Sequence, residues 1–412
     1  MQLPFLPELK DSQVLGFAIA LISSLILTPL ICNWAVKLKL LDKPGGRHIH
    51  KNPVPRLGGV SIYLSLIIAS LLFLIVYGRY SPGGIRFELL GILAGGTLIF
   101  VVGLLDDLSP LPASLKLAAQ ILSAVVAWIC DVKVKFLANP LFLIGLSETR
   151  VVELDPIVSF IVTIGWLVLI TNALNLVDGL DGLAGGVAMI TALSLWAILL
   201  DGKINQPAGA LLSATLAGAV MGFLRLNYSP ARIFLGDSGA YFLGFTLGAT
   251  AVASLSGNPN TATVGFLVLV AFSFPLFETM FTIGRRFIKG KPIMQPDSDH
   301  IHHRILKAGV SPKLTMFIIW ITCMLLGLVA SLGSSGSQKR YIILTLMIFS
   351  LFLLSSLWHR GSLPGEEAAE LSVMANGVEA TQLTLSTDKS VETEEKSSTA
   401  SDTKTKETQK NE

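Results

Sequence analysis

Two asparagines and two aspartates stand within ten residues at the end of a long apolar stretch: Asn172, Asn175, Asp178 and Asp181. A chain embedded in lipid places such groups only where water, a cation or a charged substrate meets them. The three-residue spacing stacks Asn172, Asn175 and Asp178 along one face of a helix. Each aspartate is followed by glycine, which is also a turn pattern, but a turn does not need the two asparagines. The cluster predicts a site for a cation and a phosphorylated ligand.

A pair of adjacent carboxylates, Asp106 and Asp107, ends another apolar stretch. Such a pair can ligate a divalent cation, position the counter-ion of a phosphate or act as a base. The alternative is a solvated pair that marks the membrane boundary. The residues alone do not decide between these two interpretations.

Asp237 lies in the segment Phe234-Leu-Gly-Asp-Ser-Gly239, which opens a further apolar stretch. A simple interpretation is that Asp237 caps the amino end of a helix. The two glycines also let backbone approach a ligand closely, and a carboxylate beside free amides suits a metal–phosphate complex. The segment favours a ligand site.

Three of the six histidines lie within four residues, as His300, His302 and His303, and Arg304 follows them. Positions i, i+2 and i+3 do not share a helix face, so we expect a turn here. Zinc is one candidate ligand, but no further side chains complete a tetrahedral set. Imidazoles beside an arginine suit a diphosphate better.

Two charged residues stand out within or beside apolar stretches. Glu278 lies inside one, so it should face a polar cavity or pair with a base. Lys116 begins another, where it either extends to the membrane surface or contacts phosphate.

The composition indicates which elements position these residues. Hydrophobic residues make up 52% of the chain and charged residues 14%, with a mean hydropathy of +0.66, which excludes a soluble globular protein. Lipid leaves no backbone group unpaired, so apolar stretches of roughly 20 residues must be helices. We predict an all-α, polytopic membrane protein with about eleven spans, the fourth and last being the weakest: 14–36, 58–77, 88–105, 115–130, 157–174, 183–200, 207–224, 239–256, 263–284, 314–332 and 341–358.

Charge distribution predicts the orientation. The loops 37–57 and 285–313 are rich in Lys and Arg, whereas loops of the other parity are short and poor in them. The positive-inside rule then places the amino terminus outside and both basic loops in the cytoplasm. Eleven spans leave the carboxyl terminus in the cytoplasm too, and every candidate site falls on the cytoplasmic face.

Two segments depart from the helical pattern. Alternation near residue 134 predicts a small hairpin beside the membrane. Residues 361–412 change abruptly to Glu, Lys, Ser and Thr, which predicts a disordered cytoplasmic tail after a transmembrane domain of residues 1–360.

The motifs, in this order, closely resemble the polyprenyl-phosphate N-acetylhexosamine-1-phosphate transferases of glycosyltransferase family 4, multi-pass enzymes that move a sugar 1-phosphate from a UDP-sugar to a lipid phosphate. The resemblance covers roughly residues 14–358. Single motifs are weak, but five in sequence on one face are specific. They are His50–Gly59, Leu105–Asp107, Asn172–Ala184, Phe234–Gly239 and His300–His303.

The resemblance implies a role for each matched residue. Asn175 and Asp237 would ligate Mg²⁺, for which Mn²⁺ can substitute, and Asp106 and Asp107 would act catalytically by orienting the lipid phosphate. The remaining matched positions would bind the UDP-sugar, with Phe234 stacked on uracil and the histidine group on the diphosphate or amino sugar. These substrate-binding positions are Asn172, Asp178, Asp181, Phe234, His300, His302, His303 and Arg304. The family does not settle the roles of Lys116, Glu278, Arg56 and Lys51, and we add Lys116 to the substrate contacts.

The family has two branches that compete for this chain. The branch that uses UDP-N-acetylmuramoyl-pentapeptide has a lysine-rich stretch after its aspartate pair and three contiguous histidines. Here Asp107 is followed by Leu-Ser-Pro-Leu-Pro-Ala-Ser, and Ile301 interrupts the histidines. The chain is therefore more similar to the UDP-N-acetylglucosamine branch, which initiates surface glycans such as O-antigen or teichoic acid.

The resemblance also implies the partners and the location. They are a UDP-N-acetylhexosamine, polyprenyl (undecaprenyl) phosphate and membrane lipid in a bacterial inner or plasma membrane, with no nucleic acid. The sequence leaves open whether the protein forms a homodimer. We expect one-step attack of the lipid phosphate on the UDP-sugar, with an aspartyl-phosphate route as the rival. The competing class is a transporter or flippase, but its charges would spread through the depth of the membrane, and an inactive scaffold is the third alternative.

Overall fold

Among the residues that the structure describes, seven helices are long and apolar enough to cross a membrane, which makes the chain a multi-pass membrane protein. The computed structural model describes residues 9–42, 53–77, 83–139, 148–149, 151–200, 204, 206–255, 261–290 and 300–333. The seven long helices are α1 (Leu9–Lys37), α2 (Gly58–Tyr77), α3 (Gly83–Leu108), α6 (Pro156–Val177), α8 (Pro207–Asn227), α9 (Gly236–Leu255) and α13 (Pro312–Gly333). Each coincides with a predicted span.

The other helices in the described part of the chain are shorter. They are α4 (Ala113–Ile129), α7 (Leu183–Leu199), α10 (Thr261–Ala271), α11 (Ser273–Ile288) and α12 (Ile301–Lys307). The expected spans 115–130 and 183–200 are the 17-residue helices α4 and α7. The expected span 263–284 is two helices, α10 and α11, bent by 70° at a break. The predicted span 341–358, the tail 361–412 and Lys51 lie outside the described residues.

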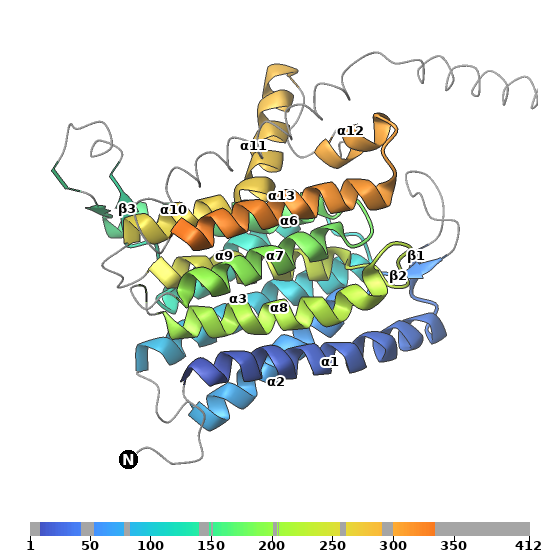
Figure 1. Cartoon of the computed structure of the whole chain (residues 1–412), viewed down its shortest axis with the longest axis horizontal. Helices are drawn as coiled ribbons and strands as arrows, with labels where there is room; N and C mark the ends of the chain where they lie inside the picture. Colours follow the sequence, from blue (N-terminus) through green and yellow to red (C-terminus); the bar gives the residue numbers. More distant parts are fainter. Residues whose placement is uncertain are drawn as a thin grey trace, which may run out of the picture. The chain divides into compact units, whose positions relative to one another are not determined.

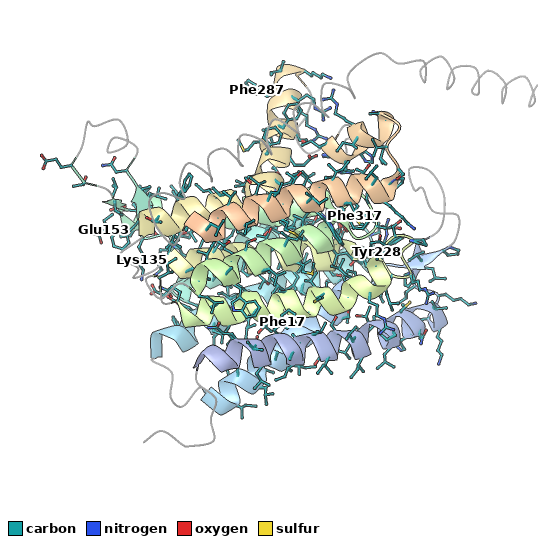
Figure 2. All side chains as sticks on the ribbon, viewed as in Figure 1. Phe17, Lys135, Glu153, Tyr228, Phe287 and Phe317 are labelled. Carbon is teal, nitrogen blue, oxygen red and sulfur yellow. The ribbon has the colours of Figure 1, made fainter. Side chains whose placement is uncertain are left out.

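Two small antiparallel sheets accompany the helices in the part of the chain that the structure describes. The predicted hairpin is present: β3 (Phe136–Ala138) pairs with β4 (Val151–Glu153). A second pair, β1 (Leu41–Asp42) with β2 (Val54–Pro55), was not expected from the sequence. Lys135 and Glu153 mark the hairpin at one end of the bundle, and Tyr228 lies toward the other end (Figure 2).

Helix α9 is the centre of the bundle (Figure 1). It contacts α2, α3, α6, α7, α8 and α10, and 94% of its apolar stretch is buried, against 28% of the apolar stretch of α1. Its small residues permit this crowding. A Cβ added at Gly244 would lie 2.7 Å from the Cα of Thr171 on α6. The polar amino end of α9 is thereby held among the ends of several helices.

A backbone pairing fixes the segment that leads into α9. Phe234 donates its N–H to the carbonyl of Pro55 (2.8 Å), and Gly58 and Gly59 donate to the carbonyls of Phe234 and Leu235 (both 2.9 Å). The loop before α2 and the loop before α9 therefore lie side by side, although almost 180 residues separate them in the chain.

Candidate active site

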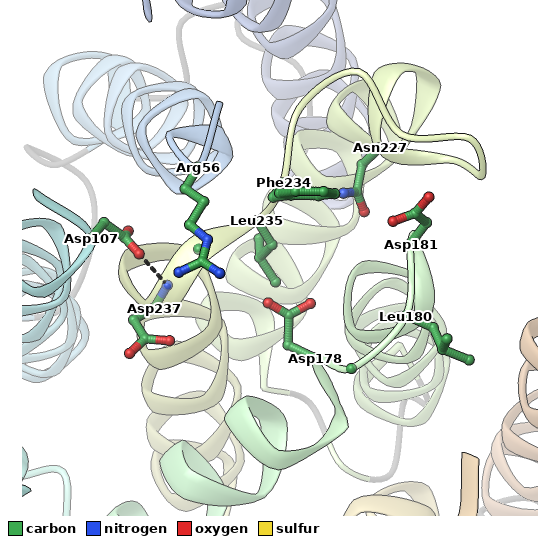
Figure 3. Close-up of a pocket in the computed structure, with 11 residues that line it drawn as sticks. Arg56, Asp107, Asp178, Leu180, Asp181, Asn227, Phe234, Leu235 and Asp237 are labelled. Atoms are coloured by element: carbon green, nitrogen blue, oxygen red, sulfur yellow. Dashed lines mark hydrogen bonds between the residues drawn. The ribbon is translucent and has the colours of Figure 1, made fainter. Parts of the chain in front are cut away.

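A pocket of about 180 Å³ opens where the ends of α3, α6 and α8 meet the start of α9 (Figure 3). Five segments supply its wall, the loop before α2 among them, and four carboxylates face it. Its lining residues are Arg56, Asp107, Asp178, Gly179, Leu180, Asp181, Asn227, Phe234, Leu235, Gly236 and Asp237. The structure thus brings together Asp107, Asp178, Asp181, Phe234 and Asp237 of the predicted site.

Asp107 serves as the cap of α9. Its Oδ1 accepts a hydrogen bond from the backbone N–H of Asp237 (2.7 Å), and its Oδ2 accepts one from Ser238 (3.0 Å). The positive end of the helix dipole also stabilises a carboxylate at this place. The interpretation of Asp237 as the cap is corrected: α9 has already begun at Gly236, and the capping carboxylate comes from α3.

Gly236 allows this approach. Its φ is +76°, and an added Cβ would lie 2.5 Å from the carbonyl oxygen of Arg56 and 2.6 Å from Oδ2 of Asp107. A side chain would be strained by the backbone and would also push the cap away. The Gly-Asp pair is therefore required by geometry: the glycine lets Asp107 reach the helix, and Asp237 follows it into the pocket.

A chain of polar contacts joins Asp106 to Asn175 through Lys116 and Asp237. The Lys116 ammonium donates to Oδ2 of Asp106 and lies 3.3 Å from Oδ2 of Asp237. The Asn175 amide donates to Oδ1 of Asp237 (3.1 Å). Asp106 also accepts from the N–H of Leu111 (2.7 Å) and is buried, so it does not line the pocket. Lys116 is thus a partly exposed cation held between two carboxylates.

Asn172 lies apart from the pocket. Its amide donates to Oε1 of Gln120 on α4 (2.7 Å) and to the carbonyl of Val168 (2.8 Å), and its Oδ1 accepts from Gln120 (3.2 Å). This reciprocal amide pair ties α6 to α4. The predicted substrate contact of Asn172 stays a prediction, and nothing in the described contacts brings it to the pocket wall.

The turn after α6 carries the other two aspartates. Oδ2 of Asp181 accepts a hydrogen bond from the N–H of Ala231 (3.0 Å), which holds the loop after α8 against the turn. The Asp178 side chain opens into the pocket. Surrounding protein that displaces bulk water raises the pKa of the Asp178 carboxyl, and the charges of Asp237 and Asp107 raise it further.

The histidines lie on a helix and not in the expected turn. His300 precedes α12, and His302 and His303 are in its first turn. The expectation of a turn was wrong because a short helix forms when its first backbone N–H groups find hydrogen-bond acceptors. The histidines do not have to lie on one face of that helix. That end is satisfied by Glu278 of α11: its Oε1 accepts from the N–H of Ile301 (3.1 Å) and from Nδ1 of His300 (3.0 Å).

Glu278 therefore pairs with a base, one of the two outcomes that its depth predicted. Its side chain is 1% exposed. A carboxylate accepts only, so the Nδ1 of His300 must carry the proton in this contact. One buried side chain thus fixes both the start of α12 and the orientation of its first imidazole.

His302 connects α12 to the acidic turn. A Cβ added at Gly179 would lie 2.1 Å from Nε2 of His302, so the imidazole packs directly on this glycine. His302 is 2% exposed, and its Nε2 has no hydrogen-bond partner among the described residues. Burial lowers the pKa of His302 well below its usual value, and the charges of His303 and His300 lower it further. His300, His302, His303 and Arg304 all lie outside the pocket wall.

The donor chemistry fits Mg²⁺ bound together with a substrate. Among the residues that the structure describes, no three His, Cys, Asp or Glu side chains form a group that would hold a metal ion by itself. Mg²⁺ is usually bound by one or two carboxylates with substrate phosphates and waters, not by an all-protein cage. Asp237 with Asn175, adjoining a pocket that Asp178 also lines, offers such a partial set of oxygen ligands.

Three residues matter more in the structure than in the sequence. Arg56, which the motifs left without a role, lies among Asp107, Asp178 and Asp237 in the pocket (Figure 3). Asn227 lines the pocket and donates to the carbonyl of Ile233 (2.9 Å). Gln120 pairs with Asn172 as described. A polar residue at the end of an apolar stretch was the available signal for Asn227, whereas Gln120 gave none.

A comparison with known proteins agrees with this geometry. Residues 89–255 match the model of glycosyl transferase family 4, and this range runs from within α3 to the end of α9. The chain is 31% identical over 343 residues to a probable undecaprenyl-phosphate N-acetylglucosaminyl 1-phosphate transferase of Bacillus subtilis. The matched region covers 83% of this chain and 89% of that protein. The chain belongs to glycosyl transferase family 4.

Two further relatives extend the family match. An undecaprenyl-phosphate alpha-N-acetylglucosaminyl 1-phosphate transferase of Thermotoga maritima is 32% identical, over 81% of this chain and 94% of its own length. A decaprenyl-phosphate N-acetylglucosaminephosphotransferase of Mycolicibacterium smegmatis is 33% identical, over 73% and 78%. The three relatives named here carry names of the N-acetylglucosamine branch, which is the branch that the motifs favour.

Proposed function

We propose that this protein transfers N-acetylglucosamine 1-phosphate from UDP-N-acetylglucosamine to polyprenyl (undecaprenyl) phosphate and releases UMP. The observation that carries the proposal is one pocket at the end of membrane helices in which four carboxylates, Arg56 and Phe234 converge. The names of the relatives support both the sugar phosphate and the lipid acceptor. Such a reaction would start the assembly of a lipid-linked surface glycan.

The pocket supplies a group for each part of the donor. The Phe234 ring offers a face on which uracil would stack. The Arg56 guanidinium is suited to the diphosphate because its planar donors match phosphate oxygens. Mg²⁺, with Mn²⁺ as a substitute, would be held by Asp237 and Asn175 and would lower the repulsion between the diphosphate and the incoming phosphate.

The acceptor needs positioning more than activation. A phosphate monoester with a second pKa of about 6 is largely dianionic at neutral pH. One of its oxygens would attack the β-phosphorus of the donor, the bond from that phosphorus to the bridging oxygen would break, and UMP would leave with the electron pair. Lys116, held between Asp106 and Asp237, would bind the acceptor phosphate, and Asp106 and Asp107 would hold this arrangement in place.

The location follows from the two substrates. A polyprenyl chain stays in the bilayer, so its phosphate lies at the membrane surface, while a nucleotide sugar arrives from water. We place the pocket on the cytoplasmic face of a bacterial plasma membrane, because the basic loops 37–57 and 285–313 favour that side and would attract both anions.

The test is an assay of the purified, full-length protein with UDP-N-acetylglucosamine, undecaprenyl phosphate and Mg²⁺. We expect UMP and the lipid diphosphate sugar in equal amounts and no turnover after chelation of the metal. A panel with UDP-N-acetylgalactosamine and UDP-N-acetylmuramoyl-pentapeptide defines the donor. Absence of product with every donor would reject the transferase. UMP release without the lipid acceptor would reject the one-step reaction.

A further inference from the structure

A second cavity lies between α1 and α8, close to the end of α8 at which the candidate active site is found. Its volume is about 520 Å³, against about 180 Å³ for the candidate active site, and the two share no lining residue. Guanidinium groups face it from one side and apolar side chains from the other. The lining residues that matter here are Leu25, Pro29, Arg225, Leu226, Tyr228 and Arg232.

The cavity begins where a close helix crossing ends. A Cβ added at Gly218 of α8 would lie 2.3 Å from the carbonyl oxygen of Phe17, and one at Gly222 would lie 2.9 Å from that of Leu21. The two helices therefore touch along these glycines. Farther along α8 the larger Arg225 and Leu226 replace glycine, and the space between the helices opens.

Two positive charges face this space without a countercharge. Arg225 and Arg232 are exposed, neither makes an ion pair with any residue that the structure describes, and no carboxylate lines the cavity. The backbone of Arg232 is fixed, because its N–H donates to the carbonyl of Leu226 (2.8 Å) and its own carbonyl accepts from Sγ of Cys32 (3.4 Å). Two guanidinium groups on a fixed backbone suit the oxygens of a phosphate.

The other side of the cavity is suited to hydrocarbon. Leu25 and Pro29 of α1 line it. Beside them α1 presents an apolar row at four-residue spacing, in which Ile22, Ile26 and Leu30 are each more than half exposed. In a membrane this row contacts lipid chains. A ligand that joins a phosphate to a hydrocarbon chain matches both halves of the cavity.

We propose that this cavity binds the phosphate of an anionic membrane lipid, with Arg225 and Arg232 on the phosphate oxygens and α1 along the chain. Its effect would reach the candidate active site through the loop after α8. Ala231 of that loop donates to Asp181, and Ile233 accepts from Asn227, both of which line the active-site pocket. A bound lipid steadies this loop and should raise turnover. The binding does not rest on the proposed function, whereas the effect on turnover does.

The experiment measures lipid binding to the full-length protein by native mass spectrometry in detergent, with phosphatidylglycerol and phosphatidylcholine as the two probes. We expect the wild type to prefer phosphatidylglycerol. The double variant Arg225→Gln/Arg232→Gln should bind it at least about tenfold more weakly, because hydrogen bonds to charged groups are lost. Lys37→Gln/Lys313→Gln removes two positive charges from other helix ends and should bind as the wild type does.

Three results would overturn the proposal. They are unchanged phosphatidylglycerol affinity in the arginine variant, an equal loss in the lysine control, and inorganic phosphate that binds the cavity as tightly as the lipid. The third would assign a site for free phosphate. Turnover in phosphatidylcholine nanodiscs with and without phosphatidylglycerol adds a separate readout. If the wild type has no transferase activity, the proposed function fails and the binding result still stands.

Discussion

Two neighbouring regions, the acidic pocket and the histidine helix α12, are held in place in different ways. In the pocket, two of the four carboxylates have several partners from distant segments. Asp107 accepts from two backbone amides of α9, and Asp237 contacts both Lys116 and Asn175. Helix α12 has fewer supports in the described part of the chain: Glu278 caps its amino end, and His302 packs on Gly179.

This difference predicts different responses to substitution. Where several partners hold a group, removing one of them changes the chemistry of the pocket more than its shape. Where one buried side chain orients a helix, a small change there moves every residue on that helix. The histidine region should therefore be sensitive to residues that never touch a substrate, and the acidic region should be sensitive mainly to the carboxylates themselves.

The largest effect is expected for Asp237→Ala. This change removes the carboxylate that joins Lys116 to Asn175, while the backbone N–H groups that Asp107 caps remain. We expect kcat/KM to fall by at least about 100-fold, as when a preorganised electrostatic contact to a reacting group is lost. The melting temperature should stay close to that of the wild type.

The matched control is Asp131→Asn. Asp131, like Asp237, forms ion pairs with lysine, in this case with Lys133 and Lys135. It lies beside the hairpin at the other end of the bundle. Its φ of +68° is tolerated by asparagine. Full activity is expected. If Asp237→Ala kept more than about a tenth of the wild-type activity, its assignment to the reacting centre would be wrong.

The second effect is expected for Glu278→Gln. The amide oxygen in place of Oε1 can still accept from Ile301 and from Nδ1 of His300, but the negative charge beside the imidazole is lost, and the amide N–H₂ in place of Oε2 can no longer accept from Ile301. We expect KM for the UDP-sugar to rise by about tenfold, in line with other residues that orient ligand-binding histidines, with a smaller change in kcat. Steady-state kinetics at varied donor concentration separates the two.

A merely structural role for Glu278 would give another pattern. Thr279→Val removes a buried hydroxyl that donates a hydrogen bond to the carbonyl of Pro275 on the same helix. It should leave KM unchanged. Equal melting temperatures for the two variants with a rise in KM only for Glu278→Gln would support positioning. A loss of stability in Glu278→Gln with unchanged KM would contradict it.

The two regions also differ in how far the sequence predicts them. Local patterns were sufficient for the apolar helices and for the acidic cluster, because apolar length and polar residues at span ends are visible along the chain. The seven long helices coincide with predicted spans, and Asp107, Asp178, Asp181, Phe234 and Asp237 meet in one pocket. The break between α10 and α11 was not predicted, although the chain becomes less apolar after it and Pro275 lies in the first turn of α11.

The roles within the site were harder to predict, because they depend on partners far away in the chain. Asp107 caps a helix that begins 129 residues later, as the numbering shows, and Glu278 caps α12 from across a segment of more than 20 residues. Gln120 looks like an ordinary residue of an apolar helix until α4 packs against α6, and Lys116 stands out in the sequence, but its partner Asp237 is 121 residues away. Spacing identified the residue types, and only tertiary contacts assigned their partners.

A smaller effect tests the contact that joins the two regions. In Gly179→Ala the new Cβ would displace His302, whose Nε2 would lie 2.1 Å from it. We expect a few-fold loss of activity. If the loss comes only from the contact with His302, Gly179→Ala should cause no further loss of activity in a His302→Ala background. The two substitutions would then be strongly coupled in a double-mutant cycle. Additive losses would mean that Gly179 acts elsewhere, for example on Asp178.

The smallest effect concerns pH and stability. Burial of His302, with His303 and His300 beside it, lowers the pKa of its imidazole in the folded protein below the usual 6.5. Between these two pKa values the unfolded chain binds more protons, so this contribution to stability is complete above about pH 6.5 and is lost as the pH falls. The loss cannot exceed about 1.4 kcal/mol for each pH unit. Melting temperatures of the wild type and His302→Gln, measured from pH 7.5 to 5, should therefore differ in slope below about pH 6.5. Carboxylates titrate in both proteins, so only the difference between the two curves reports on His302, and parallel curves would mean that its imidazole is not desolvated by packing on Gly179.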